Sequence, residues 1–140
     1  MTDYLERLRR EGLHLIILKD GKTIFTSSEE GMRPLLEAIN RIGLPELNGS
    51  IVVDKIVGKA AAILISYFKA KETHCIVLSV RAREVLDKHG IKYCSEQVIP
   101  EIRNKLGTDI CPFEKIVLEV EDPKEGYELL SAKLKFQRHI

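Results

Sequence analysis

The chain has 140 residues, of which 44% are apolar and 31% are charged, a composition typical of a globular protein with one buried core. We therefore expect a single domain over residues 1–140. The 22 basic side chains nearly cancel the 21 acidic ones, so the formal net charge is +1. This balance argues against a function based on nucleic-acid binding.

The longest apolar run is about half of the roughly 20 residues that a membrane span needs, and no leader peptide is recognisable. Cys75, Cys94 and Cys111 are odd in number and lack the spacing of a zinc ribbon. Cys75 and Cys94 fall in apolar strand candidates, where we expect small buried side chains. The sequence predicts a cytoplasmic protein with reduced thiols and without a membrane anchor, cofactor or nucleic-acid partner. Scarce Asn and Gln with abundant Lys and Glu favour a thermophilic source.

The first third of the chain predicts a helix, a hairpin and a second helix. Residues 2–11 form an amphipathic pattern that suits a helical lid on a sheet. The dipeptide Asp20-Gly21 lies between two apolar runs and supplies the positive φ angles of a two-residue hairpin turn. Pro34 and the apolar stripe after it predict a helix from Arg33 to Arg41. The polar loop before this helix, which includes Gly31, is a candidate lining of a site.

The rest of the chain alternates strands and helices after a loop, GLPELNGS. The predicted elements are a strand IVVDKIVG, a helix KAAAILISYFKA that is apolar on nearly all sides, a strand THCIVLSV, a helix RAREVLDKHG and a strand IKYCSEQV. Three further helices are predicted over IPEIRNKLG, over CPFEKIVLEVED and from Pro123 onward. This order predicts an α/β protein, a three-layer α/β/α sandwich with a mixed sheet.

Gly58 and Lys59 stand at the predicted start of the buried helix. A phosphate-binding P-loop is excluded, because Val53 occupies the place of its first Gly and Ala60 that of its Ser or Thr. A more general anion site stays open, since the free N–H groups of a helix N-terminus are partly positive and Lys59 adds a full charge. The alternative is a Gly-assisted helix start with a solvent-facing lysine.

Asp54 and Lys55 interrupt an apolar strand, and charged residues are seldom buried unless they are paired. In one interpretation, strand alternation points Asp54 outward and it has no function. In the other, Asp54 pairs with Lys59 at the mouth of a pocket. A lysine so placed would bind phosphate, or act as a base or nucleophile if burial lowered its pKa.

Cys111 opens the segment CPFE, in which Pro112 suits the first position of a helix and Glu114 completes the spacing of a capping box. The structural interpretation is a helix start. In the functional one, the helix N-terminus stabilises the thiolate, and Cys111 is a nucleophile or a redox centre. A metal site built from Asp54, Cys111 and Glu114 would lack histidine, which is an uncommon set of ligands, and we expect no metal.

The segments VVDKIVGKAAA, YCSEQVIPEIRNKLG and CPFE, in this order, resemble a small prokaryotic family of domains of unknown function placed in the cytidine-deaminase-like superfamily. The resemblance spans nearly the whole chain and implies an α/β/α sandwich. That superfamily holds zinc with a His-or-Cys, x, Glu signature on one helix start and PCxxC on the next. This chain has VGKAAA and SVRAREV there, so the resemblance implies a zinc-free domain. It carries over a pattern without an established role: Asp54, Lys55, Gly58, Lys59, Cys111, Pro112 and Glu114.

The leading hypothesis is a zinc-free deaminase-like domain that binds a nucleotide-like or phosphorylated small molecule. Lys59 and the helix N–H groups would hold the anion, Asp54 would orient Lys59 or a ribose hydroxyl, and Cys111 with Glu114 would form the opposite wall. One alternative is an enzyme in which Cys111 is a nucleophile or redox centre and Lys59 or Asp54 helps to activate it. Another is a non-catalytic partner-binding module in which these residues are scattered. A homo-oligomer is compatible with each.

Overall fold

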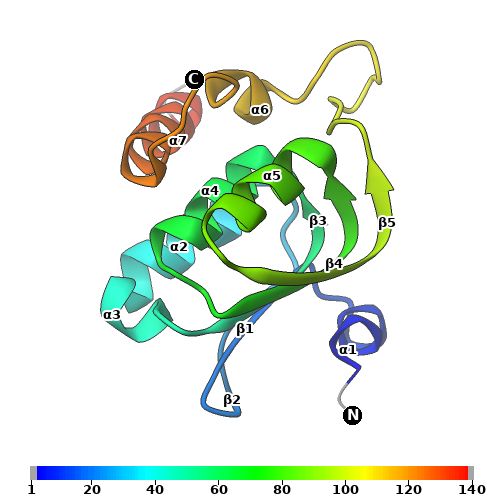
Figure 1. Cartoon of the computed structure of the whole chain (residues 1–140), viewed down its shortest axis with the longest axis vertical. Coiled ribbons are helices and arrows are strands. Elements are labelled where there is room, and N and C mark those ends of the chain that lie inside the picture. The colour runs from blue at the N-terminus through cyan, green and yellow to red at the C-terminus, as the bar shows by residue number, and fades with distance from the viewer. Residues whose placement is uncertain (1–2, 139–140) are drawn as a thin grey trace.

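The computed structural model describes residues 3–138, which form a five-stranded mixed sheet with helices on both faces (Figure 1). The strands are β1 (Leu15–Lys19), β2 (Lys22–Ser27), β3 (Ile51–Val57), β4 (Glu72–Ser79) and β5 (Lys92–Ile99). The helices are α1 (Tyr4–Glu11), α2 (Arg33–Ile42), α3 (Leu44–Leu47), α4 (Lys59–Tyr67), α5 (Val80–Lys88), α6 (Pro112–Ile116) and α7 (Pro123–Arg138). The predicted three-layer α/β/α sandwich is confirmed.

The strand order is β2-β1-β3-β4-β5. Strand β1 is antiparallel to both of its neighbours, β2 and β3. Asp20 and Gly21 adopt φ angles of 51° and 78° and close the predicted hairpin between β1 and β2. Strands β3, β4 and β5 are parallel and are joined through α4 and α5. The start of β1 therefore lies beside the second half of β3, where Leu15 pairs with Asp54.

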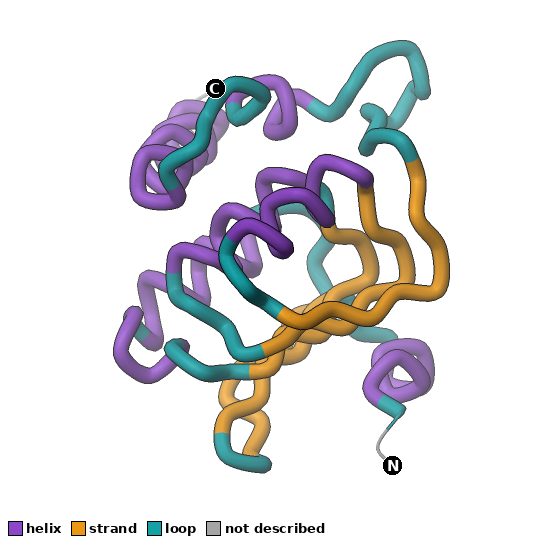
Figure 2. Tube along the Cα trace, in the orientation of Figure 1, coloured by secondary structure: helices purple, strands orange, loops and turns teal. Residues whose placement is uncertain are grey.

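Helix α4 is the centre of the larger core. All of its residues from Lys59 to Ser66 are buried, because it lies between the sheet and the helices α2, α5, α6 and α7 (Figure 2). Helix α7 approaches it so closely at Gly126 that a Cβ there would lie 2.5 Å from Cγ2 of Ile63. The prediction of a helix that is apolar on nearly all sides is confirmed.

Helix α1 packs alone on the opposite face of the sheet (Figure 1). Leu5 and Leu8 of this helix form a second, smaller core with Ile16 of β1 and Val53 of β3. The helical lid predicted over residues 2–11 is confirmed from Tyr4 onward, and Thr2 lies outside the described residues. In the described part of the chain, no helix is both long enough and apolar enough to span a membrane.

One predicted helix is wrong, and another is shorter than predicted. The segment predicted as a helix over IPEIRNKLG instead completes β5 and then forms a loop closed by a bridge between Arg103 and Ile110. The side chain of Asn104 accepts a hydrogen bond from the backbone N–H of Thr108, which favours a turn over a helix. The helix predicted over residues 111–122 ends at Ile116, after which the backbone continues in tighter turns.

Smaller differences concern a loop and a cysteine. The predicted loop GLPELNGS contains the one-turn helix α3. Cys75 is buried as predicted, but Cys94 is exposed, because β5 is an edge strand whose residues are mostly in contact with solvent. The other predicted strands and helices are present with boundaries that differ by only a few residues.

Candidate functional site

A cavity of about 310 Å³ opens at the carboxyl end of β3. Ligands of open α/β sheets commonly bind at this edge, outside the carboxyl ends of the parallel strands. Six segments line the cavity: the start of β1, the loop into α2 with the first turn of that helix, the end of β3, the first turn of α4, the segment after β5 and the start of α6. The lining residues are His14, Leu15, Glu29, Glu30, Gly31, Met32, Pro34, Leu35, Asp54, Lys55, Ile56, Gly58, Ala61, Ile102, Arg103, Lys105, Cys111, Phe113 and Glu114.

Asp54 brings a carboxyl group into this mostly apolar cavity. It lies on β3, between Leu15 of β1 and Cys75 of β4, and is half-buried. Burial raises its pKa from 3.8 to about 7, and the backbone amides of Ile56 and Lys55 offset only part of this effect. The pKa of the Cys75 thiol is raised to about 12, mainly by burial and then by the charge of Asp54. Asp54 is therefore a carboxyl group that is readily protonated near neutral pH.

Glu114 caps the N-terminus of α4 from a distant part of the chain. Its Oε1 accepts the backbone N–H of Lys59 at 2.8 Å, and its Oε2 accepts that of Ala60 at 2.7 Å. The side chain is only 6% exposed, and burial raises its pKa, opposed by the two N–H groups and then by Arg81 and Lys59. The negative carboxylate at the positive end of the helix satisfies two backbone donors that would otherwise be buried without partners.

Gly58 is required by this contact rather than by its backbone conformation. Its φ of −99° and ψ of −175° are extended and open to any residue. A Cβ at this position, however, would lie 2.3 Å from Oε1 of Glu114 and 2.7 Å from Cγ1 of Ile102. The glycine leaves the space in which the carboxylate reaches the helix, so Gly58 and Glu114 of the sequence pattern form one structural unit.

Lys59 fits neither sequence interpretation. Its side chain is 8% exposed, and its Nζ donates to the backbone carbonyl of Leu118 at 2.8 Å. It lines a second depression of about 250 Å³, together with Arg81, Glu84, Val85, Lys88, Leu118 and Glu121, and not the cavity that holds Asp54. The structure therefore does not bring Lys59 and Asp54 together, and the α4 N–H groups expected to hold an anion are bonded to Glu114.

Cys111 lines the same cavity as Asp54 and Glu114. It occupies the N-cap position of α6, as predicted, but its side chain makes no capping bond. The predicted capping box does not form, because Glu114 turns away from its own helix and binds α4 instead. The backbone N–H of Cys111 donates to the carbonyl of Ile102 at 2.8 Å, which joins the two ends of the segment between β5 and α6.

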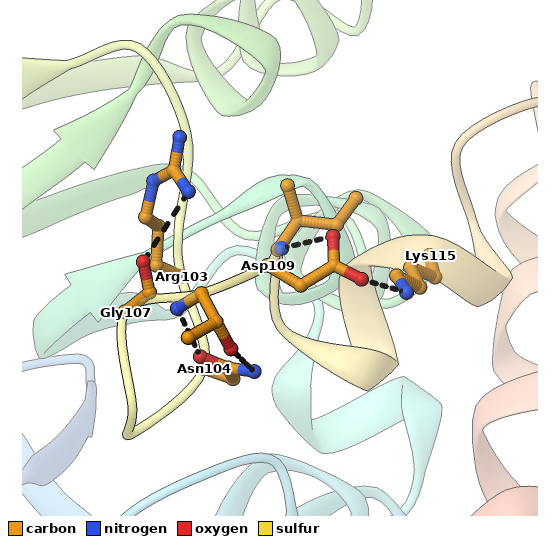
Figure 3. A network of polar contacts seen from close by, with 7 residues as sticks. Arg103, Asn104, Gly107, Asp109 and Lys115 are labelled. Carbon is orange, nitrogen blue, oxygen red and sulfur yellow. Dashed lines mark hydrogen bonds and ion pairs between the residues drawn. The ribbon is translucent and has the colours of Figure 1, made fainter.

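This segment, residues 102–111, folds into a short hairpin held by polar contacts (Figure 3). Several of its residues form one wall of the cavity. Arg103 donates to the carbonyl of Gly107, and the backbone N–H of Asn104 donates to the carbonyl of Asp109. Asp109 pairs with Lys115 of α6, which ties the hairpin to the helix that carries Glu114. Arg103 also pairs with Glu101 at 2.8 Å. We call residues 102–111 the wall hairpin.

The cavity rim carries charges of both signs. Nε2 of His14 lies 3.9 Å from Oε1 of Glu30, and Arg103 is paired with Glu101. Lys55 and Lys105 line the cavity, and neither side chain has a partner among the described residues. These two ammonium groups come from β3 and from the wall hairpin, and they are available to a ligand.

Sequence reasoning identified part of this site. Asp54, Lys55, Gly58, Cys111 and Glu114 line the cavity, as does Gly31 of the polar loop before α2. It missed the residues His14, Glu29, Glu30, Ile102, Arg103, Lys105 and Phe113. Those of the wall hairpin were missed because the segment was assigned to a helix. The turn-forming residues in the sequence NKLGTD were the available signal.

The described residues contain no group of three or more His, Cys, Asp and Glu side chains arranged to hold a metal ion. In particular, the structure does not assemble Asp54, Cys111 and Glu114 into such a group. Both carboxylate oxygens of Glu114 are already bonded to backbone N–H groups.

The strand order and the helices on both faces of the sheet define an α/β/α protein with a mixed sheet (Figure 1). Two structures of Acinetobacter baumannii RibD, forms 1 and 2, each align with a TM-score of 0.50 and 13% identity. Each alignment covers 60% of this chain and 28% of RibD, so the chain corresponds to about a quarter of that protein. At this identity the likeness concerns the fold alone.

The chain belongs to the family described as Domain of unknown function (DUF1893), whose model matches residues 4–134. The crystal structure of a DUF1893 family protein from Thermotoga maritima aligns with a TM-score of 0.82 and 34% identity. The alignment covers 92% of this chain and 86% of the Thermotoga protein. No curated protein matches the chain significantly. The predicted membership of a family of unknown function is thus confirmed, whereas its placement in the cytidine-deaminase-like superfamily stays a prediction.

Replacing Glu114 tests its role as the cap of α4. We expect Glu114→Ala to lower the free energy of unfolding by about 2–4 kcal/mol, because two buried N–H groups lose their acceptors. Glu114→Gln keeps one carbonyl acceptor and should cost roughly half as much. Urea denaturation measures both, with the exposed Glu119→Ala of the same segment as the control. Equal stability of Glu114→Ala and the wild type would contradict the assignment.

Replacing Asp54 tests the pH dependence of stability. Because the folded-state pKa is raised from 3.8 to about 7, the wild type loses stability as pH rises through this window, and the cost is complete above it. A difference of about 3 pKa units corresponds to about 4 kcal/mol of unfolding free energy. Because Asp54 is only half-buried, solvent screening reduces the expected effect to about 1–3 kcal/mol.

We therefore expect Asp54→Asn to be more stable than the wild type at pH 8 and equal to it near pH 4. Denaturant melts across this range measure the difference. Glu29→Gln, which removes an exposed carboxylate from the same rim, is the matched control. A constant difference between Asp54→Asn and the wild type at all pH values would show that the carboxyl group of Asp54 is not perturbed.

Proposed function

We propose that the cavity at the end of β3 binds a small cytoplasmic molecule that is nucleotide-like or otherwise phosphorylated. The observation that carries the proposal is an apolar cavity with one half-buried carboxyl group, Asp54, and two unpaired lysines, Lys55 and Lys105. Small-molecule sites are concave and mostly apolar, with a few polar groups that fix orientation. A volume of about 310 Å³ lies at the lower end of their range and suits a mononucleotide-sized ligand better than a dinucleotide.

The anionic group of the ligand would be held by Lys55 and Lys105. The N-terminus of α4 is occupied by Glu114, and Lys59 is directed to Leu118, so neither of the groups first expected to bind phosphate faces the cavity freely. Lysine binds phosphate as a point charge and does not need the fixed geometry of an arginine fork. The planar part of the ligand would then enter the apolar interior beside Asp54.

The proposed domain does not use zinc for hydrolytic deamination. A zinc deaminase binds the metal through one histidine or cysteine and two further cysteines and adds a glutamate that moves protons. The cavity lining offers His14 and Cys111 as its histidine and cysteine, and its buried glutamate, Glu114, is bonded to α4. The cavity lining therefore suits the binding of a small molecule better than zinc-dependent deamination.

A thermal-shift screen tests the proposal. We expect nucleoside 5′-monophosphates or sugar phosphates to raise the melting temperature by several degrees. Ligand at about 100 times its dissociation constant adds roughly 2.7 kcal/mol of stability. The doubly substituted Lys55→Ala, Lys105→Ala protein should lose the part of the shift that depends on phosphate, measured against the free nucleosides.

Lys92→Ala is the matched control, because Lys92 is an exposed lysine at the start of β5, at the opposite edge of the parallel strands. It should respond like the wild type. A screen in which no phosphorylated compound stabilises the wild type would remove the proposal.

A second candidate function, an enzyme with Cys111 as nucleophile or redox centre, is favoured by one observation. Cys111 and Asp54 line the same cavity, and the thiol of Cys111 is not engaged in capping. A carboxylate in the same cavity that accepts a proton near neutral pH would be suited to activate a thiol within its reach. The third alternative, a partner-binding module with scattered motif residues, agrees with the position of Lys59 but not with those of Asp54 and Cys111.

Alkylation by iodoacetamide distinguishes this second candidate. If Cys111 is an activated nucleophile, it should be modified at pH 7 at least tenfold faster than Cys94, an exposed free thiol of the same chain that serves as internal control. Mass spectrometry of the two peptides gives both rates. The advantage of Cys111 should shrink in Asp54→Asn. A Cys111 that reacts no faster than Cys94 would count against catalysis by this thiol.

A further inference from the structure

Titratable residues from several elements line the cavity with Asp54 or pair with its strand, but none of them neutralises it. Its own strand carries Lys55. The surrounding elements contribute Cys75 from β4, His14 before β1, Glu29 and Glu30 before α2, Arg103 and Lys105 from the wall hairpin, and Cys111 and Glu114 from the start of α6. The cations Arg81 and Lys59 act on Glu114, whereas Asp54 is governed by burial and by two backbone amides. No cation therefore holds Asp54 in its charged form.

A ligand in the cavity would move Asp54 further from the charged form for two reasons. It would displace the water that still reaches the half-buried carboxyl group, and desolvation disfavours a carboxylate. It would also bring a phosphate, whose negative charge disfavours a second negative charge nearby. Both effects favour the neutral carboxylic acid of Asp54. Lys55 and Lys105 would pair with that phosphate and would therefore not stabilise a charged Asp54.

We infer that Asp54 binds the ligand as a neutral carboxylic acid and donates its O–H to an acceptor in the part of an anionic ligand that enters the cavity. This inference rests on the proposed function and adds the chemistry of recognition to it. The geometry behind it is the half-buried carboxyl group of Asp54 in the lining of a mostly apolar cavity, to which the unpaired cations Lys55 and Lys105 also belong.

The protonated form of Asp54 determines which ligands fit. An ionised carboxylate only accepts hydrogen bonds, whereas a carboxylic acid donates one and accepts others. The inserted part of the ligand must therefore present a carbonyl oxygen or an unprotonated ring nitrogen to Asp54. A ligand that presents only N–H donors at this point leaves the acid O–H without a partner, which costs affinity in a desolvated site.

The test compares dissociation constants of the wild type and of Asp54→Asn for nucleoside 5′-monophosphates between pH 6 and 8.5. The amide of Asn also offers one donor and one acceptor but does not titrate. Titration of the phosphate and of His14 occurs in both proteins and cancels in the ratio of their constants. We expect the wild-type constant, relative to that of Asp54→Asn, to stay level below about pH 7 and to rise about tenfold per pH unit well above it.

Calorimetry provides a second measurement that does not require Asp54→Asn to bind. Titrations of the wild type at pH 8 in two buffers of different ionisation enthalpy give the number of protons taken up. With a pKa of about 7 for free Asp54, binding should take up about 0.9 proton. A level or falling ratio of constants with rising pH, or the absence of proton uptake, would overturn the inference and leave small-molecule binding intact. Absence of wild-type binding at every pH would remove the proposed function and this inference together.

Discussion

The contact between Glu114 and the N-terminus of α4 organises the rest of the structure. It joins two segments more than 50 residues apart, and it supplies the acceptors that the buried helix lacks at its start. Helix α4 is enclosed by the sheet and the other helices, so water cannot satisfy these N–H groups. The carboxylate that replaces water fixes the position of α6. The position of α6 in turn places Cys111, Phe113 and the wall hairpin at the end of β3.

Of the four carboxyl groups that line the cavity, Asp54 and Glu114 are the two that are withdrawn from solvent, and their surroundings give them different tasks. Burial raises the pKa of both. Glu114 is compensated by two short hydrogen bonds from α4 and by nearby cations, which is how a structural carboxylate is usually kept in a protein interior. Asp54 receives only two backbone amides and no cation. A group held in an unfavourable state beside an open cavity is characteristic of functional sites, because a simple packing role would be served better by an apolar residue.

The sequence predicts most of the architecture because the signals are local. The turn at Asp20 and Gly21, the apolar stripe after Pro34 and the apolar helix after Gly58 each follow from neighbouring residues, and the order of elements then selects the α/β/α class. The two misjudged helices lie between Ile99 and Asp122, where Asn104 closes a local turn and Glu114 makes a distant contact. The spacing of Cys111 and Glu114 imitates a capping box, yet the carboxylate caps another helix, which local spacing cannot reveal. The same reason explains why Asp54 and Cys111 were identified while Lys59 was placed in the wrong cavity.

The wall hairpin has a base that is fixed by contacts with the core and a tip that is free to vary. At its base, Ile102 and Cys111 are joined by a backbone hydrogen bond and lie against Gly58 and Glu114. At its tip, Leu106 is 85% exposed, and the neighbouring residues are in contact with solvent. Changes in the length or composition of the tip would therefore alter the entrance of the cavity without disturbing the core. The tip of this turn is thus the part of the cavity wall that can change while Asp54 and the cap of α4 stay in place.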